Sequence, residues 1–180
     1  MEDARRETGQ RLDRGDEVRE LAERVKARLL VAVPEALRAA GVRGQCYCLV
    51  LAHGETLFPL TLIVGREADR RAILAARGSA ARGYLYTPTE PAVELADTVG
   101  ARDRALLDEG IARTNAWELG RRTLQLAARE LGGRDWSGVL DVTEDFVVLA
   151  LDYEGDELAE SLAACVPQDR LAGLRAQGLV

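Results

Sequence analysis

Five acidic side chains gather directly after an apolar segment near the C-terminal end of the chain. They are Asp152, Glu154, Asp156, Glu157 and Glu160. Carboxylates at this spacing could ligate Ca²⁺ or Mg²⁺ through their oxygens, but the twelve-residue EF-hand pattern is absent, as is the lysine expected beside nuclease carboxylates. The alternatives are a solvated turn that complements the dipole of the next helix and a negative docking surface for a basic partner. We predict partner binding by these residues and no bound metal.

Three cysteines and one histidine are the next candidates for metal or acid–base chemistry. Cys46 and Cys48 lie two apart on a predicted strand and should face the same side, and Cys165 lies near the other end of the chain. Zinc usually needs four ligands, whereas free cysteine behaves as a small buried apolar side chain. His53, at a predicted turn, has no recognisable nucleophile to serve. We expect the cysteines in the core, His53 exposed, and no cofactor.

Tyrosines in an irregular segment are a second candidate for a binding surface. Tyr84 and Tyr86 lie within residues 78–98, which glycines and prolines interrupt, and tyrosine on loops is favoured at partner sites. We predict that both are exposed and contact a partner. Trp117 falls on the apolar stripe of a predicted helix and is expected in the core, although with Trp136 and the two tyrosines it could line a pocket.

No residue pattern typical of an enzyme occurs in the chain. The sequence has no Gly-x-Ser-x-Gly motif, phosphate-binding loop, dinucleotide-binding glycine pattern, His-Glu-x-x-His pair or kinase signature. We therefore predict no catalytic residue and favour a non-enzymatic protein, although the absence of motifs does not exclude an enzyme.

The composition is that of a globular protein with an acidic balance. The 180 residues are 47% apolar and carry a net charge of −6, which fits one domain with its own core and argues against a nucleic-acid-binding surface. No apolar run is long enough for a transmembrane helix, and the charged N-terminus lacks the apolar core of a signal peptide. We expect a cytoplasmic protein without membrane contact, and the abundance of arginine and alanine suggests a bacterial genome rich in GC.

The N-terminal segment is predicted to be helical. Residues 1–14 are polar and expected to be frayed or an early helical turn, ahead of a single domain over residues 15–180. Apolar residues recur at helical spacing from Asp16 to Val33. Pro34 should interrupt this helix, with a short helix or kinked continuation ending at Gly41.

A hairpin is predicted next. Strands are expected over Gln45–Ala52 and Thr56–Val64, joined by a tight turn at His53–Gly54. The first strand is apolar on both faces, which indicates an interior position. Pro59 lacks an N–H and favours an edge or a bulge for the second strand.

The remaining elements complete the predicted fold class. Helices are expected over 67–76, 91–97, 101–131, 156–165 and 167–177, and strands over 139–142 and 146–152. The strand at 146–152 is apolar at consecutive positions and should be central in the sheet. Helices at both ends of the chain and a mostly antiparallel sheet of three to five strands predict an α+β fold.

The segment Asp145–Asp152 near the C-terminal end reads DFVVLALD and is followed by an acidic turn and then by Val166-Pro167. This pattern resembles a bacterial family catalogued only as a domain of unknown function. Cys46–Val64 is similar to the opening hairpin of that family, and Tyr86–Glu90 to its aromatic–proline–acidic segment. No catalytic residue is defined for the family. Its association with toxin and immunity genes implies a binding protein.

Three functional hypotheses stay open at this point. The favoured one is a cytoplasmic protein that binds a protein partner, such as an immunity protein that neutralises a toxin. The second is a small metal-dependent hydrolase that uses the acidic residues 152–160. The third is a self-associating structural module, a homodimer formed through the helix at 16–33 or through a sheet edge.

Overall fold

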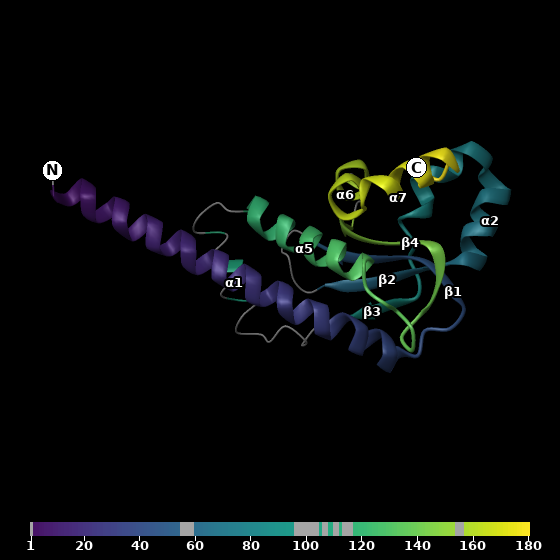
Figure 1. Ribbon diagram of the computed structural model, residues 1–180, viewed down its shortest axis with the longest axis horizontal. Coiled ribbons are helices and arrows are strands. Elements are labelled where there is room, and N and C mark those ends of the chain that lie inside the picture. The colour runs from purple at the N-terminus through teal and green to yellow at the C-terminus, as the bar shows by residue number, and fades with distance from the viewer. Residues whose placement is uncertain are drawn as a thin grey trace.

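Four strands form one mixed sheet with helices packed around it (Figure 1). The computed structural model describes residues 2–54, 60–95, 105, 108–109, 112, 117–153 and 157–180, with side chains from Asp16 onward except that of Ser79. The strands are β1 (Gln45–His53), β2 (Thr61–Arg66), β3 (Ala92–Glu94) and β4 (Asp141–Asp152), in the spatial order β3-β2-β1-β4. β2 pairs antiparallel with β1 and with β3, whereas β1 and β4 are parallel. The α+β prediction is confirmed, with one parallel pair in the sheet.

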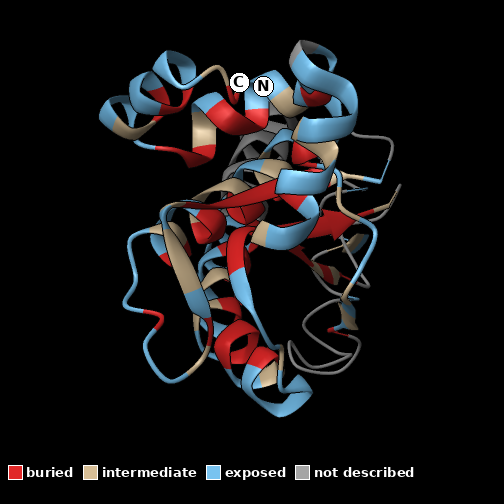
Figure 2. Ribbon diagram, turned by 90° about the vertical axis from the view of Figure 1, so that its right-hand side faces the viewer, coloured by how far each residue is buried: buried red, intermediate tan, exposed pale blue. Residues whose placement is uncertain are grey.

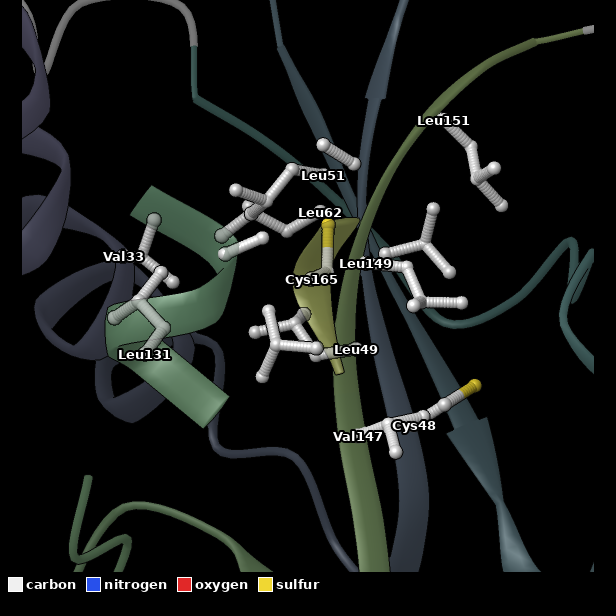
Figure 3. Close-up of a cluster of buried hydrophobic side chains, with 14 of the residues drawn as sticks. Val33, Cys48, Leu49, Leu51, Leu62, Leu131, Val147, Leu149, Leu151 and Cys165 are labelled. Carbon is white, nitrogen blue, oxygen red and sulfur yellow. The ribbon is translucent and has the colours of Figure 1, made fainter. Parts of the chain in front are cut away.

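Helices α1 and α5 cover one face of the sheet. The described helices are α1 (Glu2–Ala40), α2 (Glu67–Arg77), the 3-10 helix η1 (Gly78–Ala81), α3 (Arg82–Leu85), α5 (Trp117–Gly132), α6 (Leu158–Cys165) and α7 (Gln168–Ala176). Because strand side chains alternate between faces, Leu49, Leu51 and Leu62 lie together, towards Val33 of α1 and Leu131 of α5 (Figure 3). All five side chains are fully buried and form the centre of the core.

The opposite face of the sheet is only partly covered. Cys48, Leu149 and Leu151 point to this side (Figure 3), where α2 packs against β1 and β2. Buried positions concentrate on the strands and on the inward sides of the helices, while the outer helix surfaces are exposed (Figure 2). The segment from α3 to β3 crosses the remaining area, and the candidate site lies there.

Helix α1 runs without interruption through Pro34, so the segment after this residue continues the helix, as one of the two predicted alternatives had it, and does not form a separate short helix. The apolar stripe explains the continuation, because Val25, Leu29, Val33 and Leu37 follow one another at four-residue spacing and are all fully buried. A proline inside a helix costs about 3 kcal/mol, and burying each of these side chains contributes about 1.5–3 kcal/mol. The helix begins at Glu2, and its first turns extend beyond the other described elements (Figure 1).

Strand β4 lies at an edge of the sheet, so its predicted central position is wrong. It is also one strand from Asp141 to Asp152 rather than two. The apolar run is buried because α6 and α7 cover the free edge: Ser161 Oγ donates to the Ala150 carbonyl at 2.7 Å, and Arg170 Nη1 to the Phe146 carbonyl at 2.8 Å. These donors occupy carbonyls that would otherwise be open to another strand.

Strand β3 replaces the helix predicted at 91–97. The Val64 amide donates to the Pro91 carbonyl at 3.1 Å, and the Leu95 amide donates to the Leu60 carbonyl at 2.9 Å. Pairing with a neighbouring strand here outweighs the helical preference of the local sequence. β2 therefore has a partner on both sides and is interior, so the edge position, one of the two alternatives predicted from Pro59, is wrong. The other alternative, a bulge at Pro59, falls on residues 55–59, which lie outside the described residues.

The other helices lie close to their predicted positions. α2, α6 and α7 differ from the predictions by one or two residues at their ends. α5 begins at Trp117, and most of residues 101–116, where the long helix was predicted to start, lie outside the described residues. α5 approaches β4 closely, because a Cβ on Gly132 would lie 3.8 Å from the Val148 backbone nitrogen.

Candidate functional site

Two adjoining hollows lie on the partly covered side of the sheet. The first, of about 540 Å³, is lined by Tyr47, Arg66, Asp69, Ile73, Arg77, Tyr84, Thr87, Pro88, Thr89, Glu90 and Pro91. The second, of about 310 Å³, is lined by Val50, Ala52, Thr61, Ile63, Tyr86, Thr87, Pro88, Thr89, Ala92, Leu151, Asp152 and Tyr153. The segment Thr87–Thr89 borders both, so the two hollows form one surface, called here the two-hollow surface.

One side of α2 forms a wall of the first hollow. Asp69, Ile73 and Arg77 recur every four residues and therefore share a helix face, and Arg66 immediately precedes the helix. The wall presents cation, anion, apolar group and cation in that order along the helix. Among the described residues, neither Arg66 nor Arg77 forms a salt bridge.

A bulge in β1 brings Tyr47 to the hollow. The strand register shifts between Cys46 and Cys48, and a bulge of this kind re-aims the side chain of the extra residue. Gly65 makes room for it: a Cβ at this position would lie 2.5 Å from Cys48 Sγ and 2.7 Å from the Tyr47 ring. The Tyr47 hydroxyl donates to the Leu85 carbonyl, which ties the bulge to α3.

An ion cluster beneath the first hollow fixes α2 against the sheet. Arg70 contacts Glu67 at 2.6 Å and Asp145 of β4 at 2.5 Å, and its guanidinium lies 4.9 Å from the centre of the Tyr47 ring. Burial works against the charge of Arg70, but the hydrogen bonds that its guanidinium donates to the two carboxylates raise its pKa overall. These buried charges hold one side of α2 against the sheet, and the side that forms the wall faces the first hollow.

The floor of the second hollow is the sheet itself. All four strands contribute: Ala92 from β3, Ile63 from β2, Val50 and Ala52 from β1, and Leu151 from β4. Two of these five side chains are alanines, and small side chains leave a depression between larger neighbours. An apolar floor with a polar rim is the usual composition of a binding pocket.

An exposed tyrosine borders each hollow. Tyr84 is 50% exposed and lies beside the first, with the guanidinium of Arg77 stacked 3.8 Å from its ring centre. Tyr153 is 56% exposed and lies beside the second, with its hydroxyl 2.5 Å from Thr61 Oγ1. Its ring also packs on Gly54, 3.6 Å from the position of a Cβ there. Both rings are therefore held in place while presenting a large surface.

The two hollows are lined by tyrosines, threonines, arginines and carboxylates beside apolar side chains. Among the described lining residues there is no histidine, cysteine, serine or lysine. Burial raises the pKa of Tyr47, and it also raises the pKa of Tyr86, so neither phenol ionises at neutral pH. The hydroxyl of Tyr47 is in addition committed to the Leu85 carbonyl. The surface offers aromatic, cationic and hydroxyl groups that can hold a ligand.

The predicted exposure of the two tyrosines is confirmed for one of them. Tyr84 is exposed, but Tyr86 is 1% exposed, and the prediction that it lies on the surface is wrong. Its ring meets the Tyr47 ring edge-on at 6.1 Å. The burial follows from the bulge, because the re-aimed Tyr47 provides an aromatic partner that the sequence does not reveal. Tyr86 still forms part of the wall of the second hollow.

The described members of the acidic cluster lie in two different places. Glu157 and Glu160 contact Arg121 of α5 at 2.6 Å and 3.2 Å, and Glu118 contacts the same guanidinium. Asp152 instead lines the second hollow. Glu154 and Asp156 lie outside the described residues. Because Arg121 already binds two of the carboxylates, the described part of this cluster joins α5 to α6 and offers a basic partner less charge than the sequence suggests.

Cysteines and histidine lie in the interior. Cys46, Cys48 and Cys165 are free and buried, as predicted, although the bulge between the first two breaks the alternation on which their shared face was predicted. Burial raises the pKa of Cys46 to about 11 and that of Cys48 to about 12. His53 is the last residue of β1 and is 9% exposed, so its prediction as an exposed turn residue is wrong. β1 extends one residue further because the Tyr153 amide donates to the His53 carbonyl.

The two tryptophans lie apart from the hollows. Trp117, predicted in the core, is 45% exposed at the start of α5. Trp136 is buried, its ring centre is 5.7 Å from that of Phe146, and its indole N–H donates to the Leu131 carbonyl at 3.1 Å. Neither lines the two-hollow surface, so the predicted aromatic pocket contains tyrosines alone.

Sequence reasoning missed most of the surface. Arg66, Arg77, Thr61 and Tyr153 were not singled out. They come from β2, from α2 and from the residue after β4, which meet only in the folded protein. The four-residue spacing of Asp69, Ile73 and Arg77 is the one local signal that marks an outward-facing side of α2.

Comparisons with known proteins found no match to a family model, to a curated protein or to a solved structure. Across the described residues, no three histidine, cysteine, aspartate or glutamate side chains group closely enough to hold a metal ion. The helices in the same part of the chain include none with the length and apolar character needed to cross a bilayer.

Proposed function

We propose that the chain is a non-catalytic binding protein that holds a protein partner on the two-hollow surface. The observation that carries the proposal is the arrangement of Tyr84 and Tyr153, two exposed and braced rings beside hollows that share the segment Thr87–Thr89. Tyrosine supplies large contact area at a small cost in conformational entropy. Rings that are already held by Arg77 and Thr61 lose still less freedom when a partner binds.

The mixed chemistry of the two-hollow surface also suits a polypeptide. Its two hollows differ in chemistry, since the first is lined by charged side chains and the second has an apolar floor. A polypeptide carries polar and apolar side chains in one segment and can fill both hollows at once. Neutralisation of a toxin, which the sequence resemblance implies, is one form of such binding and stays part of the proposal.

Peptide selection with matched variants tests this function. A library of displayed peptides is selected on the wild-type protein and on a Tyr84→Ala, Tyr153→Ala double variant. We expect enriched peptides whose affinity falls at least tenfold on the double variant, the loss typical of a pair of aromatic anchors. Trp117→Ala is the control, because it removes an exposed aromatic ring that lies outside the hollows. Peptides that bind all three proteins equally would refute the proposed surface.

A further inference from the structure

The charge order along the α2 wall indicates what the first hollow binds. Arg66, Asp69, Ile73 and Arg77 follow one another along this wall. At 1.5 Å per helical residue, the backbones of the two arginines are about 16 Å apart along the helix axis. A row of this length is too long for a single small ion and matches roughly five residues of an extended chain at about 3.3 Å each.

Arg66 and Arg77 are both available to bind a carboxylate of a partner. Arg70, Arg71 and Arg121 bind carboxylates of the protein itself, whereas no described acidic side chain forms a salt bridge with Arg66 or Arg77. The guanidinium of Arg77 lies over the Tyr84 ring at 3.8 Å. Such stacking holds one face of the group and leaves its N–H edges available for a two-point hydrogen bond to a carboxylate.

From this geometry we infer that the first hollow binds an extended acidic segment of a partner polypeptide, which lies along α2 with one carboxylate at Arg66 and one at Arg77. The inference rests on the proposed function and adds the chemistry of the partner. The two acidic residues lie roughly four to six positions apart, which is the spacing that spans the wall. Between them, a hydrogen-bond donor or a cation faces Asp69 and an apolar side chain faces Ile73.

The carboxylates of the first hollow determine which acidic segments it can bind. Asp69 and Glu90 both line it, so they repel a segment that has acidic side chains at every position. Only a segment with acidic ends and a non-acidic middle matches both signs of charge. The first hollow would therefore bind an acidic segment, in contrast to the basic partner predicted from residues 152–160.

Binding isotherms of one enriched twelve-residue peptide test the inference. The peptide comes from the selection above and is labelled for fluorescence anisotropy. We expect Asp or Glu pairs at the stated spacing, a loss of about tenfold or more in affinity for Arg66→Gln and for Arg77→Gln, and weaker binding at high salt. Arg122→Gln, which removes an exposed arginine from α5, should leave affinity unchanged. Urea unfolding of each variant confirms that it is folded.

A charge swap sharpens the same experiment. Arg77→Glu should abolish binding of the selected peptide, and a peptide with lysine in place of the facing acidic residue should bind this variant again. Peptides that depend on Tyr84 and Tyr153 but not on Arg66 and Arg77 would overturn the acidic-segment inference and leave the proposed function in place. The absence of any peptide that depends on either pair would overturn both.

Discussion

The guanidinium of Arg70 and the carboxylate of Asp145 form a two-point ion pair that joins α2 to β4. Nη1 lies 2.5 Å from one carboxylate oxygen, and Nη2 lies 3.3 Å from the other. The side chains are only 11% and 18% exposed, so the pair is shielded from solvent more than a surface salt bridge. Because α2 forms one wall of the first hollow, this pair fixes the position of the wall relative to the sheet.

Replacing Asp145 with Asn should therefore destabilise the protein. We expect a loss of about 3 kcal/mol in the free energy of unfolding at pH 7, because Arg70 is left buried with Glu67 as its remaining carboxylate. Urea unfolding measures the loss. Asp16→Asn is the control, since Asp16 pairs with Arg19 at the surface with both side chains at least 70% exposed, and its loss should be below about 1 kcal/mol.

The same pair predicts a pH dependence of stability. Burial raises the pKa of Asp145, but the hydrogen bond and charge of Arg70 outweigh it, and the pKa is lowered overall. A carboxyl group with a lowered pKa stabilises the folded state above its unfolded pKa of about 3.9, and this contribution is lost as the pH falls through the folded pKa. The stability difference between wild type and Asp145→Asn should shrink below about pH 4. A difference that stays constant down to pH 2 would contradict the assignment.

Gly65→Ala should disrupt the bulge that supports Tyr47. The new methyl group would lie 2.5 Å from Cys48 Sγ and 2.7 Å from the Tyr47 ring, and overpacking of this kind costs about 1–3 kcal/mol. Gly173→Ala on α7 is the matched control, because no atom beyond its chain neighbours and the backbone of its own helix lies within 4 Å of the Cβ position and alanine favours a helix by about 1 kcal/mol. Thermal unfolding should show a lower midpoint for the first variant and an equal or higher one for the second.

Ser161→Ala should lower the free energy of unfolding, because it leaves a carbonyl at the edge of β4 without its donor. It removes the hydroxyl donor from the Ala150 carbonyl in the buried interface between α6 and β4. An unsatisfied buried carbonyl costs about 1–3 kcal/mol. Ser137→Ala removes an exposed hydroxyl that donates to Asp135 at 2.8 Å, and it should change the free energy of unfolding by less than about 0.5 kcal/mol. Equal effects of the two substitutions would argue against edge protection by α6.

Cysteine reactivity should report on global unfolding. Burial raises the pKa of Cys46 to about 11 and that of Cys48 to about 12, and it also raises the pKa of Cys165. Because the thiolate is the reactive form, Ellman's reagent at pH 8 should label none of the three in the folded protein and all three in urea. Rapid labelling of one thiol without urea would show that its part of the core opens locally.

Local patterns allowed several elements to be predicted from the sequence, and long-range contacts decided the rest. The apolar residues of β1 and the periodicity of α2 depend on nearby residues alone. The edge position of β4 depends on Ser161 and Arg170, and the strand at β3 depends on pairing with β2. No pattern within the sequence shows these partners, so burial at β4 was interpreted as a central position.

The candidate site was less predictable than the fold for the same reason. Tyr84 was identified because its type and irregular surroundings are local properties. Tyr86 was misplaced because its burial depends on Tyr47, which is 39 positions earlier in the chain and is re-aimed by a bulge. The arginines of the α2 wall carry no local signal of a binding surface, because residues 84–91 complete the first hollow only in the folded protein.

The parallel pairing of β1 with β4 also has a consequence during synthesis on the ribosome. Cys48 pairs with Val147, and about a hundred residues separate the two strands of this pair. At about 5–20 residues per second, the nascent chain carries β1 for roughly 5–20 seconds before its parallel partner emerges. During that interval one side of an apolar strand has no neighbour from its own chain, which is a condition that favours misassembly between nascent chains. Slower elongation between codons 54 and 140 should therefore reduce the yield of folded protein unless a chaperone shields β1.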